Sequence, residues 1–508
     1  MTARWSHGMR VLAALTCVLV VGCERDSPPP PAVEEALPAP AAAVEPPLLR
    51  ILVQVDGGLP GQGEDAAWLA EEVRYLLARQ GAVRLAHPDG PHDPQSGAGV
   101  HTLSLEVPRA GTGRDIVLAL NAPGGRLLEQ RPLGVRPATR LTLIQVIAAG
   151  LGPVAARDLE ASSLVPLIGT SDTDLYDEYT RTHVAHLRAL RGATSRPIRP
   201  DPPIRRLERF ERMTRRDPEF PRAWSALALA YLEVRGKDED ALAKLADDAA
   251  RRALSLDPNL PEAKAALGRT RYRYGQWLEA EDLLVAALGA DPAAPTALEA
   301  YACFLLDLGR VAYARRVGAQ ALGTAPGAED ARECLAVAEL AAGDILAAEA
   351  TLGAPQKDET AGIARARALI DLASADYDAA KTSLANLSRR NPAPWLDPVF
   401  ASLRESGSRP AALRALTRAA DVGRVDITTE TLLGAELGQA DFVFNRLVRM
   451  DEQRQAVPLR LLWLPGSRFL REHPRFAEVI DQLELRTYWN QRSRPDHCRS
   501  EPAVSGCS

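Results

Sequence analysis

Residues 261–292 read PEAKAALGRTRYRYGQWLEAEDLLVAALGADP, and this stretch decides the fold of most of the chain. Its proline, glycine and alanine positions recur at an interval of 34 residues in the segments on either side. The recurring positions are Pro258, Pro292 and Pro326; Gly275, Gly309 and Gly343; Ala246, Ala280 and Ala314; and Ala253, Ala287 and Ala321. A fixed period of this length predicts a stack of repeating helix pairs.

Each recurring residue type has a physical reason in a helix pair. Alanine lets two antiparallel helices approach closely, glycine allows the turn between them, and proline ends the second helix. Together with Trp224, Leu227, Ala228 and Tyr231, these positions resemble the signature of tetratricopeptide repeats. The resemblance implies an all-α solenoid over residues 170–450, with a concave groove lined by the first helix of each pair.

The period also places the individual helix pairs. They are predicted at residues 221–258, 261–292, 295–326, 329–352 and 361–392, followed by looser pairs at 397–421 and 427–450. An entry pair is expected at 172–216, where two segments have apolar residues at helical spacing. Residues 451–508 are predicted to form a carboxy-terminal cap and tail, with a cap helix from Arg475 to Leu485.

Composition favours packed helices and excludes several classes of protein. The 508 residues are 46% hydrophobic and 25% charged, and only 5% are aromatic. These values exclude a disordered chain, a collagen, a polytopic membrane protein and a disulfide-dense mini-domain. The net charge of −5 provides no overall field that would attract nucleic acid.

Residues 1–22 have the pattern of a lipoprotein signal peptide. Arg4 and Arg10 precede the apolar run Val11–Val21, which is too short to span a bilayer. The small residues before Cys23 resemble a bacterial lipobox, which implies cleavage before Cys23 and lipidation of its thiol. The alternatives are an ordinary signal peptide followed by a chance cysteine, and an uncleaved anchor.

Residues 23–48 are rich in proline and alanine, and they predict an extended tether. Glu24 follows the lipidation site. By resemblance to the sorting rule of Gram-negative lipoproteins, a residue other than aspartate there favours the outer membrane. We therefore expect a lipid-anchored protein of the cell envelope that faces the periplasm.

Residues 49–165 predict a small α/β domain. Strands are expected at 49–55, 83–86, 101–107, 116–120 and 126–133, with helices at 66–79 and 141–159. The opening Ile51–Val55 strand, the helix beginning near Ala66 and the three late strands resemble the TolB-like domain that precedes tetratricopeptide arrays in bacterial envelope proteins. The predicted fold is thus a TolB-like α/β domain followed by an all-α solenoid.

Four cysteines remain after Cys17 leaves with the signal peptide and Cys23 is lipidated. In an oxidising compartment Cys498 and Cys507 either form a small disulfide loop or stay as free thiols. Cys303 and Cys334 are interpreted as small buried hydrophobic residues, because they lie among apolar neighbours in predicted helices. Since the cysteines and histidines lack the spacing of a metal site, we expect neither a metal nor a cofactor.

Two loops contain residue types that could bind a ligand. The turn at 57–63 is rich in glycine but lacks the Lys–Ser/Thr pair of a phosphate-binding loop. The segment His87–Asp93 contains two histidines and two aspartates, but its proline and glycine content predicts a solvated loop. The chain also lacks a Ser/His/Asp, Cys/His or paired-carboxylate constellation, so we expect a protein that is not an enzyme.

Groove-facing positions, carried over from the tetratricopeptide pattern, predict the residues that bind a partner. They are Arg222, Arg269, Tyr272, Arg273, Glu299, Asp307, Asp330 and Glu333. These residues are predicted to form a basic, aromatic patch followed by an acidic one. The alternative is that they are merely solvated.

The most direct hypothesis is a non-enzymatic envelope lipoprotein that serves as a scaffold or assembly factor for a protein or an extended peptide. The alternative is an envelope enzyme or cell-wall-acting protein with a site at the junction of the two domains. A transcription regulator is disfavoured, because a signal peptide stands where a DNA-binding domain would be. We expect no nucleic-acid partner.

Overall fold

The computed structural model describes residues 49–56, 63–79, 83–85, 100–108, 113–135, 137, 139–155, 165–191, 202–235, 238–356, 359–387, 393–404 and 408–500. The chain divides into two compact units, Met1–Ala42 and Ala43–Ser508, and every described residue belongs to the second. The predicted signal peptide, Cys23 and the tether lie outside the described residues. So do the glycine-rich turn at 57–62 and the loop at 87–93.

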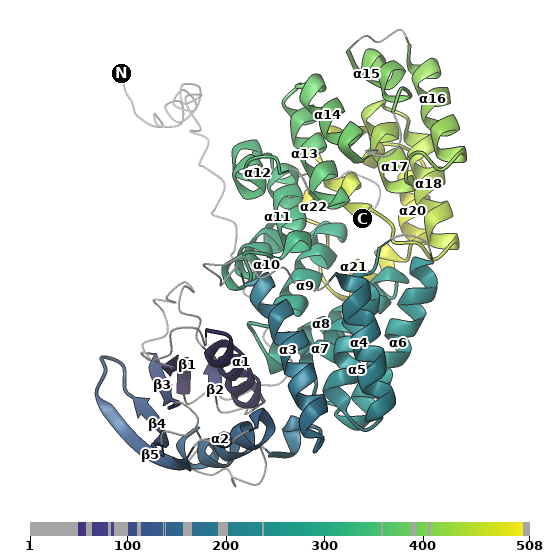
Figure 1. The fold of residues 1–508 in the computed structure, drawn as a ribbon. Helices are drawn as coiled ribbons and strands as arrows, with labels where there is room; N and C mark the ends of the chain where they lie inside the picture. The colour runs from purple at the N-terminus through teal and green to yellow at the C-terminus, as the bar shows by residue number, and fades with distance from the viewer. Residues whose placement is uncertain are drawn as a thin grey trace, which may run out of the picture. The chain divides into compact units, whose positions relative to one another are not determined.

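A five-stranded sheet begins the described part of the chain. Its strands are β1 (Leu49–Asp56), β2 (Val83–Leu85), β3 (His101–Glu106), β4 (Asp115–Asn121) and β5 (Leu127–Val135), and its helices are α1 (Gly63–Ala78) and α2 (Arg140–Ala155). The strand order is β2-β1-β3-β4-β5, with β1 parallel to β2 and β3, and with β3, β4 and β5 antiparallel. The order β-α-β-β-β-β-α is the predicted one (Figure 1).

The core of this domain forms because alternate strand residues are apolar and point to one face. The register places Leu105 of β3 opposite Leu118 of β4, and both are fully buried. They share a core with Trp68 of α1 and Ile144 of α2. Helices α1 and α2 therefore pack on the apolar face of the sheet.

Helix α3 (Thr173–Leu190) connects this domain to the solenoid. It begins at Asp172, whose carboxylate accepts a hydrogen bond of 3.0 Å from the Leu175 amide. Tyr176 of α3 is buried in the core of the sheet domain, whereas Tyr179 is buried in the core of the first helices of the solenoid. Adjacent faces of one helix thus pack on the two folds.

The rest of the described chain is mostly helical. After α4 (Pro203–Arg216), successive pairs are α5 (Pro221–Glu233) with α6 (Glu239–Leu256), α7 (Pro261–Arg273) with α8 (Trp277–Ala290), α9 (Pro295–Asp307) with α10 (Val311–Thr324), α11 (Glu329–Ala341) with α12 (Ile345–Leu352), α13 (Ala361–Ala373) with α14 (Tyr377–Leu387), α15 (Leu396–Arg404) with α16 (Arg409–Asp421), and α17 (Ile427–Glu436) with α18 (Ala440–Glu452). Figure 1 shows these helices stacked in order along the chain. The array has the helix-pair architecture of a tetratricopeptide repeat protein.

The residues that define the period have the roles predicted for them. The recurring alanines are buried where helices meet, with exposed fractions of 0–1%. Gly275, Gly309 and Gly343 lie in the turns between paired helices and have φ angles of +70°, +79° and +82°. Ala375, in the turn between α13 and α14, adopts φ +59°, so this repeat has the same left-handed turn without glycine.

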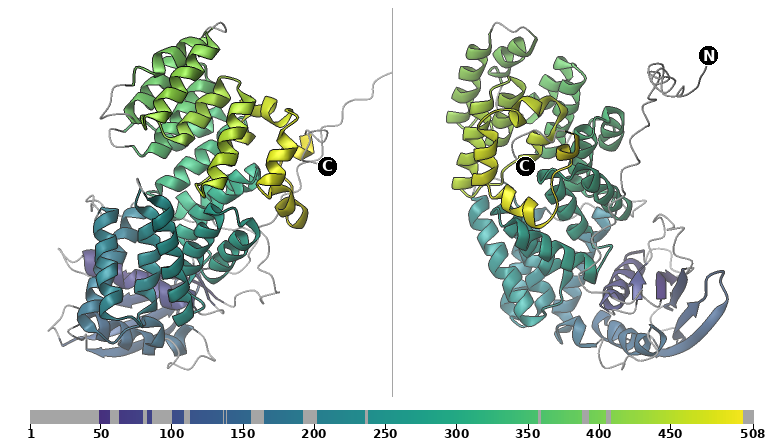
Figure 2. Two further views of the ribbon diagram at one scale, coloured as in Figure 1. Left: turned by 90° about the vertical axis from the view of Figure 1, so that its right-hand side faces the viewer. Right: turned by 180° about the vertical axis from the view of Figure 1, so that it is seen from behind.

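The described part of the chain closes with short helices that we call the C-terminal segment (residues 457–500). They are η3 (Leu459–Trp463), η4 (Pro465–Ser467), α19 (Arg468–Arg471), α20 (Phe476–Gln482), α21 (Leu485–Gln491) and α22 (His497–Ser500). The cap helix predicted from Arg475 to Leu485 corresponds to α20, which ends at Gln482; Glu484 then adopts φ +57° before α21 begins. The segment packs on α18 and also returns to α8 and α9 (Figure 2).

Among the described residues, no helix combines the length and the apolar character that crossing a membrane requires.

Candidate functional site

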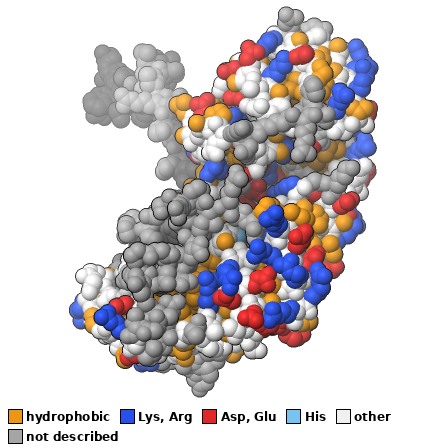
Figure 3. Space-filling model, in the orientation of Figure 1, with side chains coloured by type: hydrophobic (Ala, Val, Ile, Leu, Met, Phe, Trp, Pro, Cys, Tyr) orange, Lys and Arg blue, Asp and Glu red, His pale blue; other side chains and the backbone are white. Residues whose placement is uncertain are grey.

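The side chains predicted to line a groove come from α5, α7, α9 and α11, the first helices of four consecutive pairs. The structure places every one of them within an ion pair or hydrogen bond to another residue of the chain. The predicted division into a basic patch and an acidic patch is therefore incorrect, because opposite charges from neighbouring helices pair with each other. Figure 3 shows the same mixture of basic and acidic side chains on the outer surface.

Arg222 does not face an open groove, contrary to the prediction. Its guanidinium donates two hydrogen bonds of 2.7 Å to the carboxylate of Glu72 on α1, and both side chains are buried. The rings of Tyr75 and Tyr179 lie 4.0 and 5.0 Å from the guanidinium carbon. Burial alone would lower the pKa of Arg222, but Glu72 and the tyrosines hold it well above its usual value. We call Arg222 and Glu72 the Arg222 pair.

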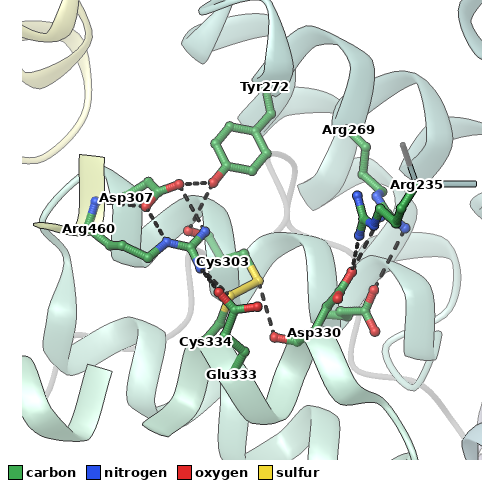
Figure 4. The surroundings of a disulfide bond; sticks show 10 residues. Arg235, Arg269, Tyr272, Cys303, Asp307, Asp330, Glu333, Cys334 and Arg460 are labelled. Carbon is green, nitrogen blue, oxygen red and sulfur yellow. Dashed lines mark hydrogen bonds and ion pairs between the residues drawn. A yellow bond between two sulfur atoms is a disulfide. The ribbon is translucent and has the colours of Figure 1, made fainter. Parts of the chain in front are cut away.

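Tyr272, Asp307 and Glu333 do not face solvent in the way predicted, because Arg460 of the C-terminal segment lies between them (Figure 4). Its guanidinium donates hydrogen bonds of 2.8 and 3.1 Å to the two oxygens of Asp307, and one of 3.1 Å to Glu333. The Arg460 amide donates a further bond to Asp307, whose other oxygen accepts the Tyr272 hydroxyl. We call these four residues the Arg460 clamp.

Electrostatics favour the charged form of this clamp. Burial alone would lower the pKa of Arg460, but Asp307 holds it well above its usual value. Burial, and then Asp307, raise the pKa of the Tyr272 hydroxyl, so this hydroxyl stays protonated and donates. Every polar group in the clamp therefore has a partner of the right kind.

The C-terminal segment holds its place through apolar burial as well. Trp463 and Trp489 are buried, and their indole N–H groups donate to the carbonyls of Asp307 and Leu308. Trp277 of α8 donates in turn to the Leu483 carbonyl at 2.7 Å. Six further apolar side chains of the segment are fully buried: Leu459, Leu462, Leu470, Phe476, Ile480 and Leu485. Exposing these side chains to water on release of the segment would cost on the order of 10 kcal/mol. A partner does not displace it easily.

Four charged residues form what we call the charged strip: Arg235, Arg269, Glu299 and Asp330. Arg269 lies 3.7 Å from Glu299 and 3.8 Å from Asp330, and Arg235 pairs with Asp330 at 2.9 Å. Burial, and then Asp330, raise the pKa of Glu299 to about 7. Arg273, the remaining predicted groove residue, lies 3.6 Å from Glu239 and outside the strip.

Cys303 and Cys334 form a disulfide between α9 and α11 (Figure 4). The interpretation of these cysteines as simple buried hydrophobic residues is therefore wrong, although both are indeed buried. The bond adjoins the clamp, since Arg460 lies 3.3 Å from the Cys334 sulfur. Cys498 is also disulfide-bonded. Cys507 lies outside the described residues, so its pairing with Cys498 stays a prediction.

Two hollows adjoin the helix array. The first, which we call the junction cavity, has a volume of about 70 Å³ and is lined by α1, α3, α4, α5, α7 and the loop at 291–296. The second, which we call the charged cleft, has a volume of about 650 Å³ and is lined by α6, the turn between α7 and α8, the end of α18 and residues 482–484. Within the described ranges, no group of three or more His, Cys, Asp or Glu residues could hold a metal ion.

Sequence reasoning missed Glu72, Arg460 and the disulfide. A signal for the disulfide was present, because Cys303 and Cys334 are 31 residues apart and lie on the first helices of neighbouring repeats. Two histidines of α3 also lie near the junction cavity: His183 is buried, and His186 is partly buried 3.2 Å from Glu233. Burial lowers the pKa of each to about 3, so both are neutral.

No protein-family model matches this sequence, and no curated protein matches it. Among solved structures, the fold is similar to one from the functional characterization of Pseudomonas aeruginosa pilF, with 18% identity over 41% of this chain and 93% of that chain and a TM-score of 0.31. It is also similar to a tetratricopeptide repeat protein from Parabacteroides merdae, with 14% identity over 52% of this chain and 98% of that chain and a TM-score of 0.33. At such low TM-scores, the repeat assignment rests on the helix pairs and their period.

Proposed function

We propose that this protein is a non-enzymatic, lipid-anchored lipoprotein of the cell envelope that acts as a protein–protein interaction scaffold or assembly factor. The lipobox at Cys23 and the tether at 23–48 support the anchor. The helix-pair array supports the scaffold role, because stacked repeats present an extended, preformed surface to a partner. The partner is a protein or an extended peptide of the envelope.

The charged cleft is the surface that we assign to this partner. The Arg460 clamp and the C-terminal segment already fill the end of the concave face that the sequence favoured. The cleft, in contrast, is a large open hollow formed where the same segment meets α6 and α7. A folded loop or an extended peptide fits a hollow of this size better than the filled face.

The observation that carries the assignment is a set of charges that the chain leaves without ion pairs. Within the described residues, Asp451, Arg454 and Glu484 line the cleft and have no salt-bridge partner. Arg454 and Glu484 are exposed, and each adopts a left-handed backbone conformation, with φ of 55° and 57°. Burial, and then Glu484, raise the pKa of Asp451. A partner that presents both a basic and an acidic side chain would neutralise them.

Site-specific photo-crosslinking in living cells tests the cleft. A photoreactive amino acid is placed at Gln276 or Glu484 in the cleft, at Tyr272 in the filled face, and at Arg418 on α16 as a matched surface control. We expect a discrete crosslinked protein from the two cleft positions and none from the other two. A crosslinked band from Tyr272 and none from the cleft would reject the cleft and show that the partner binds the concave face.

Membrane fractionation of Cys23→Ser tests the anchor. The wild-type protein should sediment with the outer membrane, and the variant should not. If crosslinking at the cleft weakens in the variant, the anchor contributes to partner capture by placing the scaffold at the membrane. Unchanged sedimentation of Cys23→Ser would reject lipidation at Cys23.

A further inference from the structure

The junction cavity has no role in the scaffold proposal, yet several charged side chains line it. They come from α1, α3, α4, α5 and α7 and from residue 291, and the start of α9 completes the lining. A volume of about 70 Å³ holds roughly five water molecules at about 10–15 Å³ each. A hollow that contains polar groups holds either ordered water or a small polar ligand.

Most charged side chains around the cavity are paired within the chain. Glu72 pairs with Arg222, Glu71 with Arg191 at 3.2 Å, and Glu233 with Arg206. The two histidines of the lining are neutral. The charges of these carboxylates and arginines are therefore balanced within the chain.

Three charged groups of the lining are left over: Arg74, Glu262 and Asp291. Within the described residues, none of them has a salt-bridge partner, although Asp291 accepts a hydrogen bond from the Ala293 amide. Burial lowers the pKa of Arg74 and raises the pKa of Glu262 and of Asp291. The hydroxyl of Tyr75, which also lines the cavity, is buried and has no hydrogen-bond partner.

A charge without an ion-pair partner is costly when it is removed from water, and one cation and two carboxylates, all partly buried, lie around this one hollow. A small anion would satisfy only Arg74, and a small cation only the carboxylates. A molecule that carries both charges would satisfy all three groups at once. The Tyr75 hydroxyl adds a hydrogen-bond donor to the same wall.

We propose that the junction cavity binds a small zwitterion, a free α-amino acid of the size of glycine or alanine. Arg74 binds its carboxylate, Glu262 and Asp291 bind its ammonium group, and Tyr75 donates a hydrogen bond to the carboxylate. Glycine has five non-hydrogen atoms, about as many as the waters it would replace. Because the ligand contacts α1 and α7 together, its binding stabilises the junction between the sheet domain and the solenoid.

Thermal unfolding of the full chain in detergent tests the proposal. The probes are glycine, L-alanine and D-alanine at millimolar concentration, with acetate and methylamine as controls that carry only one of the two charges. We expect at least one of the amino acids to raise the unfolding midpoint by about 2–5 °C, and neither control to do so. Shifts of equal size with acetate or methylamine, or no shift with any amino acid, would overturn the proposal.

Variants locate the effect in the cavity. Arg74→Met and Glu262→Gln should each weaken amino-acid binding at least tenfold by titration calorimetry, and Arg235→Met, which removes an arginine of the charged strip outside the cavity, should leave it unchanged. Asp291→Asn serves as a second test if Arg74→Met fails to fold. Wild-type affinity in a folded Arg74→Met protein would show that the ligand binds elsewhere. Loss of partner crosslinking at the charged cleft would not affect this result, because the two sites have no lining residue in common.

Discussion

Two arginines, one buried and one partly buried, join segments that are far apart in the sequence, and their surroundings differ in one respect. Arg222 binds Glu72 across 150 residues, and Arg460 binds Asp307 across 153. Around Arg460 every charge has a partner. Beside Arg222, in contrast, a hollow is lined by charges that have none. This difference indicates that fully paired charges, as around Arg460, stabilise the fold. Charges without an ion-pair partner beside a cavity, as near Arg222, indicate a candidate ligand-binding site.

The same comparison bears on the groove predicted from the tetratricopeptide pattern. Arg460 of the C-terminal segment binds two of the predicted groove residues, Asp307 and Glu333. A concave face filled by its own chain contributes to stability. This is why we propose binding at the two hollows where charges remain unpaired, the charged cleft and the junction cavity.

The largest effect is expected when the Arg460 clamp is broken. Arg460→Ala leaves Asp307 and Glu333 as unpaired carboxylates, and we expect it to lower the free energy of unfolding by about 3–5 kcal/mol. Chemical denaturation measures this loss, with Arg418→Ala on exposed α16 as the control. A loss below about 1 kcal/mol would mean that the clamp behaves like a surface ion pair.

A smaller and more local effect is expected at the Arg222 pair. Arg222→Met leaves Glu72 buried without its cation, at a cost of about 3 kcal/mol. Hydrogen exchange should rise in α1 and α3 and stay unchanged in α9 and α11, whereas Arg460→Ala should show the opposite pattern. Adding Glu72→Gln to Arg222→Met should restore part of the loss, since the buried charge is then removed. If hydrogen exchange rises equally in all four helices in both variants, the two arginine sites do not stabilise separate parts of the protein.

Much of the fold could be predicted from the sequence, because it depends on local periodicity. The alanines and glycines at the 34-residue interval predicted the helix pairs, and alternating apolar residues predicted the strands. Both patterns act between residues that are neighbours in the sequence or in consecutive repeats. The left-handed turn at Ala375 shows that the architecture persists even where the pattern lacks its glycine.

The occupants of the concave face could not be predicted in this way. A repeat period describes how each pair stacks on the next, but it contains no information on where residues 457–500 dock. Arg460 lies outside the periodic region, and Glu72 lies in another domain. The disulfide is the exception. Its two cysteines occupy first helices of consecutive repeats, so the period combined with an oxidising compartment would have been enough to infer it.

The Cys303–Cys334 disulfide tests whether the two arginine sites are independent, because it adjoins the Arg460 clamp and not the Arg222 pair. The bond closes a loop of 31 residues, and its loss should lower the free energy of unfolding by about 2–3 kcal/mol. The double variant Cys303→Ala/Cys334→Ala, compared with the oxidised wild-type protein, measures this loss, and the reduced wild-type protein should match the variant. We expect hydrogen exchange to rise in α9, α11 and η3, and to stay unchanged in α1 and α3. A rise confined to α1 would show that the disulfide does not support the Arg460 clamp.

The smallest effect is expected at Glu299, which lies in the charged strip. Its pKa of about 7 is raised from a usual value of 4.5, so the folded protein binds more protons than the unfolded chain between these two pH values. The contribution of Glu299 to the free energy of unfolding is therefore largest below pH 4.5. This contribution is lost as the pH rises through 7. Between pH 5 and pH 8 the wild-type protein should lose about 1–2 kcal/mol more than Glu299→Gln. The exposed Glu219→Gln is the matched control and should follow the wild type. If Glu299→Gln also follows the wild type, Arg269 already neutralises Glu299, and the strip is then as fully paired as the Arg460 clamp.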